Sequence, residues 1–177
     1  MWRNFMRTHW LLAALAGLAL FAPKIASAQA PNLAGSWVRH AEGSDDINAK
    51  INEATARMNF ALRGIGRSRL RKTNTPYQRV AIAYNAQQVT ITTDDRSAIQ
   101  TPANGTPIRW KREDGEMLNV STDWKNTVLE QTFAAEDGKR VNRYTLSGDG
   151  RMMTLEVTIT SPRLPQPLVY RQMYHRA

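Results

Sequence analysis

The side chains best suited to catalysis or metal binding are scarce in this sequence. It has no cysteine and three histidines, so thiol catalysis, disulfides and cysteine-ligated metal sites are excluded. His40 and His175 are the two histidines beyond residue 28, and neither belongs to a His-x-His or His-Glu-x-x-His motif. We expect them near opposite ends of adjacent strands, too far apart to share a ligand. The sequence therefore predicts no metal site and no cofactor.

Two further patterns resemble catalytic ones. Asp94 and Asp95 form a carboxylate pair that could serve acid–base chemistry, but adjacent residues of a strand point to opposite faces and a hairpin turn accounts for both. Ser36 lies in Gly-Ser-Trp rather than in a Gly-x-Ser-x-Gly elbow. We predict that the protein is not an enzyme. A small barrel enzyme remains an alternative, which would need an inward carboxylate or histidine with a shifted pKa.

The residues that could bind a small molecule lie on segments that alternate like β-strands. Apolar and polar residues alternate after residue 77, and turn residues separate the segments at hairpin spacing. With a first strand around Trp37, this pattern predicts an all-β, antiparallel up-and-down barrel of about eight to ten strands, because closure removes the exposed edges of a sheet. The predicted later strands are 79–84, 88–93, 106–111, 116–122, 127–134, 139–147, 152–160 and 168–175.

Alternation also places a few aromatic and polar side chains on the inner, apolar face. A small number of polar groups in an apolar pocket can orient a ligand, and Gln131 falls between Leu129 and Phe133 on the inward register. The alternative is that side chains fill the barrel and these groups satisfy one another. The candidate ligand-binding residues are Tyr84, Trp110, Gln131, Phe133 and Tyr144.

A helix is expected between the first and second strands. Ser44 is a candidate N-cap and Gly64 a candidate stop, so the pattern predicts one amphipathic helix over about residues 45–64. This helix could be a lid over a ligand, or it could simply plug or cover the barrel. Its apolar stripe, at helical spacing, consists of Ile47, Ile51, Ala54, Met58, Leu62 and Ile65.

A basic connector, residues 65–76, is expected to join this helix to the second strand. The densest positive charge of the chain lies here and at the end of the helix. It could attract anionic lipid head groups or other polyanions, or its cations could be a solvated helix end. Nucleic acid is not expected, because the basic residues are not interleaved with aromatic side chains. The basic patch consists of Arg63, Arg67, Arg69, Arg71 and Lys72.

Residues 1–28 have the pattern of a secretory signal peptide. A positive start with Arg3 and Arg7 precedes an apolar run of about 12 residues, too short to span a bilayer, and Ala26-Ser27-Ala28 is a cleavage site. Three of the 24 basic residues and none of the 15 acidic residues lie in this segment, so the mature net charge is +6 rather than +9. We expect a periplasmic or secreted protein in which residues 29–177 form one domain without disulfides.

Four stretches resemble a known family. They are L-A-G-S-W-V-R at 33–39, T-I-T-T-D-D-R at 90–96, Y-T-L-S-G-D-G-R-M-M-T-L-E-V-T at 144–158 and L-V-Y-R-Q-M-Y-H-R-A at 168–177. They resemble the lipocalin superfamily, the calycins, and more narrowly small exported bacterial lipocalin-like proteins. Only the Gly-x-Trp start, Gly35 and Trp37, is a recognised motif of that family.

The resemblance implies a structural role for Trp37 and a departure from ordinary lipocalins. In that family the tryptophan closes the barrel floor against an arginine of the last strand, for which Arg171 is the candidate and Arg176 the reserve. Ordinary lipocalins carry their main helix after the eighth strand. Here the helix is expected between the first two strands, where fatty-acid-binding proteins carry a helical lid.

The resemblance also implies a function. We expect a monomeric, non-catalytic carrier for a small apolar or amphipathic molecule, such as an anionic lipid or acyl chain, with an anionic membrane surface as a further partner. The alternative is a filled barrel that serves as a cell-envelope interaction module through its basic connector.

Overall fold

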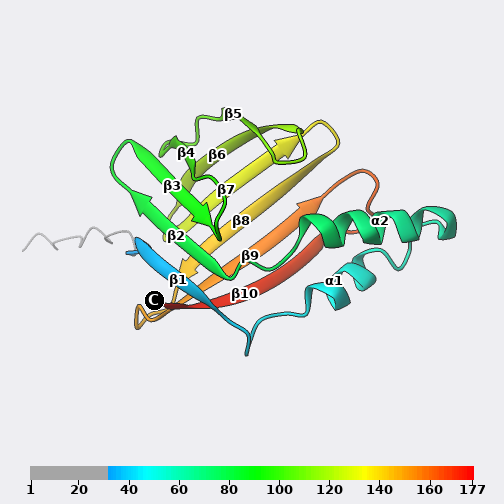
Figure 1. The fold of residues 1–177 in the computed structure, drawn as a ribbon, viewed down its shortest axis with the longest axis horizontal. Coiled ribbons are helices and arrows are strands. Elements are labelled where there is room, and N and C mark those ends of the chain that lie inside the picture. Colours follow the sequence, from blue (N-terminus) through cyan, green and yellow to red (C-terminus); the bar gives the residue numbers. More distant parts are fainter. Residues whose placement is uncertain (1–31) are drawn as a thin grey trace, which may run out of the picture.

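The computed structural model describes residues 32–177, so the predicted signal peptide (1–28) lies outside the described residues. The described chain forms ten strands and two helices (Figure 1). In chain order they are β1 (Gly35–His40), α1 (Ile47–Ala54), α2 (Phe60–Thr73), β2 (Arg79–Tyr84), β3 (Gln88–Thr93), β4 (Ile99–Pro102), β5 (Ile108–Lys111), β6 (Met117–Lys125), β7 (Val128–Ala135), β8 (Gly138–Leu146), β9 (Met152–Thr160) and β10 (Leu168–Arg176).

The strands form one antiparallel sheet that curls into a nearly closed barrel. Strands that follow one another in the chain are paired, except β4 and β5, which form the two edges of the sheet. The first and last strands, β1 and β10, also pair with each other. The strand order is β4-β3-β2-β1-β10-β9-β8-β7-β6-β5. One isolated bridge joins Asn104, just after β4, to Asp123 of β6. The predicted fold class is confirmed. Of the strands, only β4 was not predicted, because its buried residue is the polar Thr101 and its four residues show no apolar alternation.

The prediction of one helix over residues 45–64 is wrong. Two helices lie side by side near the end of the barrel where β10 begins (Figure 1). Asp46, rather than Ser44, caps α1, and Asn59 caps α2 with its side-chain oxygen. A second helix N-cap, at Asn59, therefore interrupts the predicted apolar stripe. Within the described chain, neither helix is long and apolar enough to cross a membrane.

The basic connector predicted over residues 65–76 is also mostly helical. Gly64 does not end the helix, because α2 continues through it to Thr73. The apolar stripe is split as a result. Its first part, on α1, is buried, but Leu62 and Ile65 on α2 are 58% and 69% exposed. The helices therefore have different roles: α1 packs on the core and α2 presents apolar side chains to solvent.

Trp37 closes the floor of the barrel, as expected. Its indole is fully buried, and its Nε1 donates to the carbonyl of Leu33 at 3.0 Å. Gly35 is needed beside it, because its φ of +125° favours glycine and an added Cβ would lie 3.0 Å from Nη1 of Arg176. The Gly-x-Trp pattern thus has a local physical reason.

The arginine that packs on Trp37 is Arg176, and the first candidate, Arg171, is wrong. The guanidinium of Arg176 lies 4.3 Å from the indole centroid and donates to the carbonyls of Ala34 and Asn32 at 2.8 and 3.0 Å. Trp37 pairs directly with Arg176 in the register of β1 and β10. Arg171 is an odd number of residues away, so it faces outward.

The two histidines are closer together than expected. Val38 pairs with His175, which makes His40 a diagonal neighbour of His175 on the outer face. Their ring centroids lie 6.3 Å apart in an edge-to-face arrangement. The expectation that they lie at opposite ends is therefore wrong, because β1 and β10 overlap at their ends rather than along their whole length.

The floor pair can be tested by comparing two arginines of β10. Arg176→Ala should lower the free energy of unfolding by about 1–2 kcal/mol, because it removes a cation–π contact and two hydrogen bonds to carbonyls. Arg171→Ala, which removes a largely exposed ion pair with Glu156, should cost less than about 1 kcal/mol. Urea unfolding measures both, and equal losses would contradict the assigned pairing.

Candidate ligand-binding site

The inner face of the barrel is tightly buried at the floor and accessible toward the helices. At the floor, Tyr144, Met153 and Tyr174 are fully buried with Trp37. Toward the helices, several inward side chains stay only half-buried, including the facing pair Phe133 and Arg140. Solvent therefore reaches the interior from the helical end, and this accessible part is called the mouth below.

The five predicted ligand-binding residues all lie on the inward register, but in separate groups. Trp110 and Phe133 meet edge to face at the mouth, with ring centroids 6.0 Å apart. Gln131 and Tyr144 are buried deeper, on the neighbouring strands β7 and β8. Tyr84 lies apart from them, against the ring of Trp124 at 5.4 Å. The structure thus brings four of the five onto one wall of the barrel, strands β5 to β8, and leaves Tyr84 outside this group.

An inward arginine that the sequence reading missed dominates the mouth. Arg140 of β8 donates from Nε to Oδ1 of Asn142 at 2.8 Å, and from Nη1 to Oδ1 of Asn74 at 3.3 Å. Its guanidinium also lies 5.6 Å from the ring centroid of Tyr77. None of the ion pairs formed within residues 32–177 includes Arg140. A positive charge therefore faces the interior with amide and aromatic neighbours but without a carboxylate.

One tyrosine hydroxyl lies beside this arginine, and two further tyrosines are buried deeper in the barrel. The hydroxyl of Tyr170 donates to Oδ1 of Asn74 at 3.0 Å. The same oxygen accepts the hydrogen bond from Arg140. Burial raises the pKa of Tyr144, Tyr170 and Tyr174 above the usual range. All three stay neutral at physiological pH, so they offer hydroxyl groups without adding negative charge beside the arginine.

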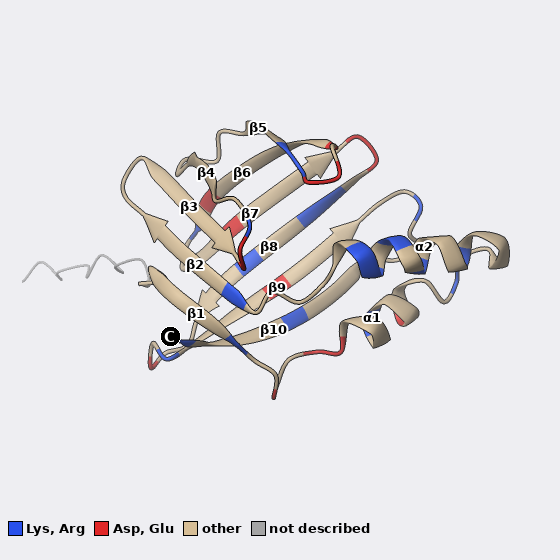
Figure 2. Cartoon of the chain, in the orientation of Figure 1, with Lys and Arg blue, Asp and Glu red and all other residues tan. Residues whose placement is uncertain are grey.

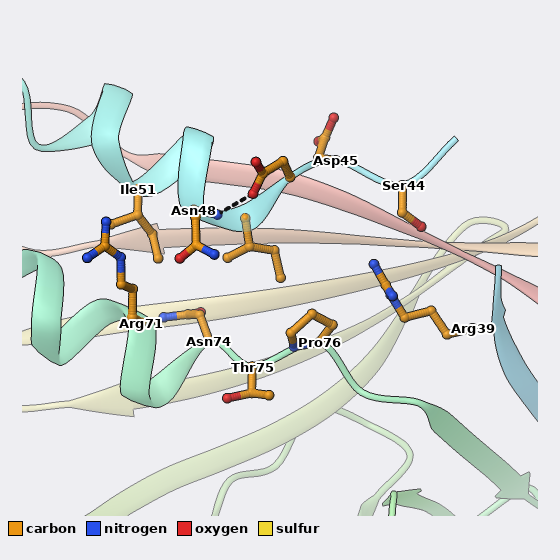
Figure 3. Close-up of a pocket in the computed structure, with 11 residues that line it drawn as sticks. Arg39, Ser44, Asp45, Asn48, Ile51, Arg71, Asn74, Thr75 and Pro76 are labelled. Carbon is orange, nitrogen blue, oxygen red and sulfur yellow. Dashed lines mark hydrogen bonds between the residues drawn. The ribbon is translucent and has the colours of Figure 1, made fainter. Parts of the chain in front are cut away.

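A cleft of about 480 Å³ lies between α1 and the segment that follows α2. Figure 3 shows residues of α1 along one wall and Asn74, Thr75 and Pro76 along the other, with Arg39 and Arg71 at the two ends. Asn74 is 3% exposed, and its side chain bonds both Arg140 and Tyr170. The cleft and the polar group inside the barrel therefore share a wall residue.

The predicted basic patch divides into two faces of α2. Arg63, Arg67 and Arg71 follow one another at a spacing of four and face α1. Nη2 of Arg63 donates to the carbonyl of Met58 at 2.9 Å, Nε of Arg67 donates to Oγ1 of Thr55 at 2.9 Å, and Nη2 of Arg71 donates to Oδ1 of Asn52 at 3.2 Å. Arg67 and Arg71 therefore tie α2 to α1 and its C-cap, while Arg63 bonds the segment between the helices.

The other two cations of the patch lie on the outer face of α2. Arg69 and Lys72 lie on the same helical stripe as Leu62 and Ile65. Neither cation takes part in an ion pair within residues 32–177. Figure 2 shows the positive residues banded along α2. The outer face therefore combines cations with exposed apolar side chains.

The missed residues differ in how well they could have been found. Arg140 has the same parity as Tyr144 on β8, so the alternation that predicts Tyr144 as inward also predicts Arg140. Asn74 gives no such signal. It is the C-cap of α2, and its place beside Arg140 and Tyr170 depends on how the helices dock on the barrel.

The buried tyrosines predict a fall in stability at alkaline pH. Their folded pKa values are raised above the unfolded value of about 10, so the unfolded chain releases protons first as pH rises. The stability should be fully present below about pH 10 and should decrease above it. Tyrosinate absorbance and urea midpoints, between about pH 8 and about pH 11, measure this, with Tyr144→Phe as the variant expected to reduce the slope. Ionisation of all tyrosines before unfolding would contradict the buried geometry.

Comparison with known proteins gives a fold rather than a family. The sequence matches no protein-family model and no curated protein. Solved structures with a similar fold include the REP1-NXSQ fatty acid transporter, with 13% identity, coverage of 84% of this chain and 98% of that chain, and a TM-score of 0.54. Human cRBP IV has 20% identity, coverage of 82% and 98%, and a TM-score of 0.52.

A third similar structure is fatty-acid-binding protein 1 of Echinococcus granulosus, with 12% identity, coverage of 82% of this chain and 97% of that chain, and a TM-score of 0.50. At such identities the likeness shows the fold alone. Each of these proteins is covered almost completely, so the match extends over their whole folds. The chain therefore has the calycin-like barrel fold that fatty-acid-binding proteins share.

Proposed function

We propose that this protein is a non-catalytic carrier that holds an amphipathic molecule with an anionic head group, such as a fatty acid, in the mouth of its barrel. The observation that carries the proposal is Arg140, an inward guanidinium without a carboxylate partner among the described residues.

The charge of Arg140 favours an anionic ligand. A partly desolvated cation is costly unless it is paired, and its present partners are neutral amide oxygens. A ligand carboxylate can accept hydrogen bonds from a guanidinium in a bidentate pair, which is stronger than a bond between neutral groups. The hydroxyl of Tyr170, held near by Asn74, can donate to the same carboxylate. An anionic head group would therefore complete this cluster.

The neighbours of Arg140 favour an apolar ligand body. Phe133 and Ile159 flank it directly in the register, and Trp110 packs on Phe133. All three are half-buried, so a ligand can remove more of their surface from water, at about 25 cal/mol per Å². The half-exposed aromatic side chains also argue against a barrel filled by its own residues.

The similar structures support binding rather than catalysis. One is named a fatty acid transporter and another a fatty-acid-binding protein. We extend this to an exported carrier in bacteria, working in the periplasm or outside the cell, because residues 1–28 have the charge, apolar run and cleavage site of a signal peptide.

The outer face of α2 supports a docking role on anionic membranes. Leu62 and Ile65 are 58% and 69% exposed on this face. Arg69 and Lys72 follow them at helical spacing on the same side. Cations that attract lipid phosphates, together with apolar side chains that insert between head groups, are the features of an interfacial helix. The helix lies next to the cleft, so docking would bring the mouth close to the membrane.

Arg140→Gln tests the head-group contact. Dodecanoate should bind this variant about 10- to 100-fold more weakly than the wild type, because a charge-assisted hydrogen bond is lost. Dodecanol should bind both proteins with similar affinity, because it carries no negative charge. Isothermal titration calorimetry measures both ligands.

Lys139→Gln is the matched control, since Lys139 is the exposed outward neighbour of Arg140 on the same strand. It should leave dodecanoate binding unchanged. If the wild type binds neither ligand, or if both variants weaken dodecanoate equally, the proposed carrier function is wrong.

Vesicle binding tests the outer face of α2. Arg69→Gln with Lys72→Gln should weaken binding to phosphatidylglycerol vesicles by about tenfold or more, at about 1 kcal/mol per charge. The control is Arg109→Gln with Lys111→Gln, which removes two exposed charges from β5. Cosedimentation measures both variants, and equal effects would mean that net charge, rather than α2, directs binding.

A further inference from the structure

A polar row crosses the barrel wall one step deeper than Arg140. Thr122 of β6 pairs in the register with Gln131 of β7, and Gln131 pairs with Asn142 of β8. The three side chains therefore share one level of the inner face. Asn142 lies two residues beyond Arg140 along β8, so this level is about 7 Å farther from the mouth.

Two side chains of this row each have a buried polar atom without a hydrogen-bond partner. Thr122 is 1% exposed and Gln131 is 2% exposed. Neither Oγ1 of Thr122 nor Nε2 of Gln131 has a partner within the described chain. A buried polar group left unpaired costs free energy, and such groups are rare enough in folded proteins to need an explanation.

Other buried polar side chains inside the barrel are satisfied, although Oγ1 of Thr101 on β4 also has no hydrogen-bond partner among the described residues. Asn142 accepts from Arg140 at 2.8 Å and donates to the hydroxyl of Tyr144 at 3.4 Å. Gln172 is 1% exposed and bonds Arg39 and two backbone carbonyls, at 2.8 to 2.9 Å. Buried amides elsewhere in the interior are therefore satisfied by the protein itself.

The unpaired atoms lie among mostly apolar neighbours. Val120 and Phe133 lie on the mouth side of the pair in the register, and Trp124 and Leu129 lie on the other side. Asn142, which pairs with Gln131, uses its amide on Arg140 and Tyr144. Thr122 and Gln131 directly face each other on adjacent strands, with Cβ atoms about 4.5–5.5 Å apart. One oxygen atom placed over the pair can accept from Nε2 of Gln131 and exchange a hydrogen bond with the hydroxyl of Thr122.

We propose that Thr122 and Gln131 form a second polar subsite, which receives an uncharged hydroxyl or carbonyl oxygen on the apolar body of the ligand. This inference rests on the proposed carrier function and names the ligand class: a hydroxy or oxo fatty acid rather than an unsubstituted one. The charged head group belongs at Arg140, because the deeper pair has no cation of its own. A site built to bond an oxygen disfavours an analogue that lacks it, since the polar groups then stay unpaired.

The test compares dodecanoate with a series of its hydroxy derivatives, the hydroxyl being moved one carbon at a time. Isothermal titration calorimetry should show at least one position that binds about tenfold more tightly than dodecanoate. In the double variant Thr122→Val, Gln131→Leu this preference should disappear, while dodecanoate itself binds at least as well as to the wild type. Thr132→Val, on the outer face of β7 beside Gln131, should keep the preference.

The stability of the ligand-free variants gives an independent measurement. Gln131→Leu should not lower the melting temperature, because it removes an unsatisfied group of similar volume. Gln172→Leu, which removes three hydrogen bonds, should lower it.

The outcomes separate the two proposals. If dodecanoate binds and depends on Arg140, but no hydroxyl position is preferred or the preference survives in the double variant, the second subsite is wrong and the pair holds bound water instead. If neither dodecanoate nor any derivative binds the wild type, the carrier function fails and the subsite with it.

Discussion

The pairing of β1 with β10 is the constraint on which the rest of this structure depends. It joins the two ends of the chain's meander and leaves only β4 and β5 as edges. It also fixes the register in which Trp37 faces Arg176, so that the floor is closed by an indole under a guanidinium. Since side chains alternate along every paired strand, this one register propagates around the sheet and decides which residues face the interior.

The interior that results is graded from floor to mouth. The floor is dry and filled by Trp37, Tyr144 and Tyr174, while the mouth holds a cation with neutral hydrogen-bond partners. Between them lies the row of Thr122 and Gln131, whose polar atoms face apolar neighbours. A barrel that served only as a packed module would gain stability by making these positions apolar. Their polarity fits a cavity in which a ligand supplies the missing acceptors.

The helices connect this interior to the surface. Arg67 and Arg71 of α2 bond α1 and its C-cap, and α1 in turn packs Ile47 and Ile51 on the core. The outer face of α2 is left with cations and exposed apolar side chains. One helix thus combines a structural face and a surface suited to lipid, and the cleft beneath it adjoins the wall residue Asn74, which bonds Arg140.

Local alternation and a short motif were enough to predict nine of the ten strands, the inward parity of Gln131 and Tyr144, and the place of Trp37. Parity could also have identified Arg140. The pairings between distant segments emerged only from the folded structure: Arg176 rather than Arg171 on Trp37, His40 beside His175, and Asn74 beside Arg140. The break between α1 and α2 has a local signal, the N-cap Asn59. The apolar stripe that runs past Asn59 favoured one continuous helix instead. Contacts across strands and helices depend on register and docking, which no local pattern encodes.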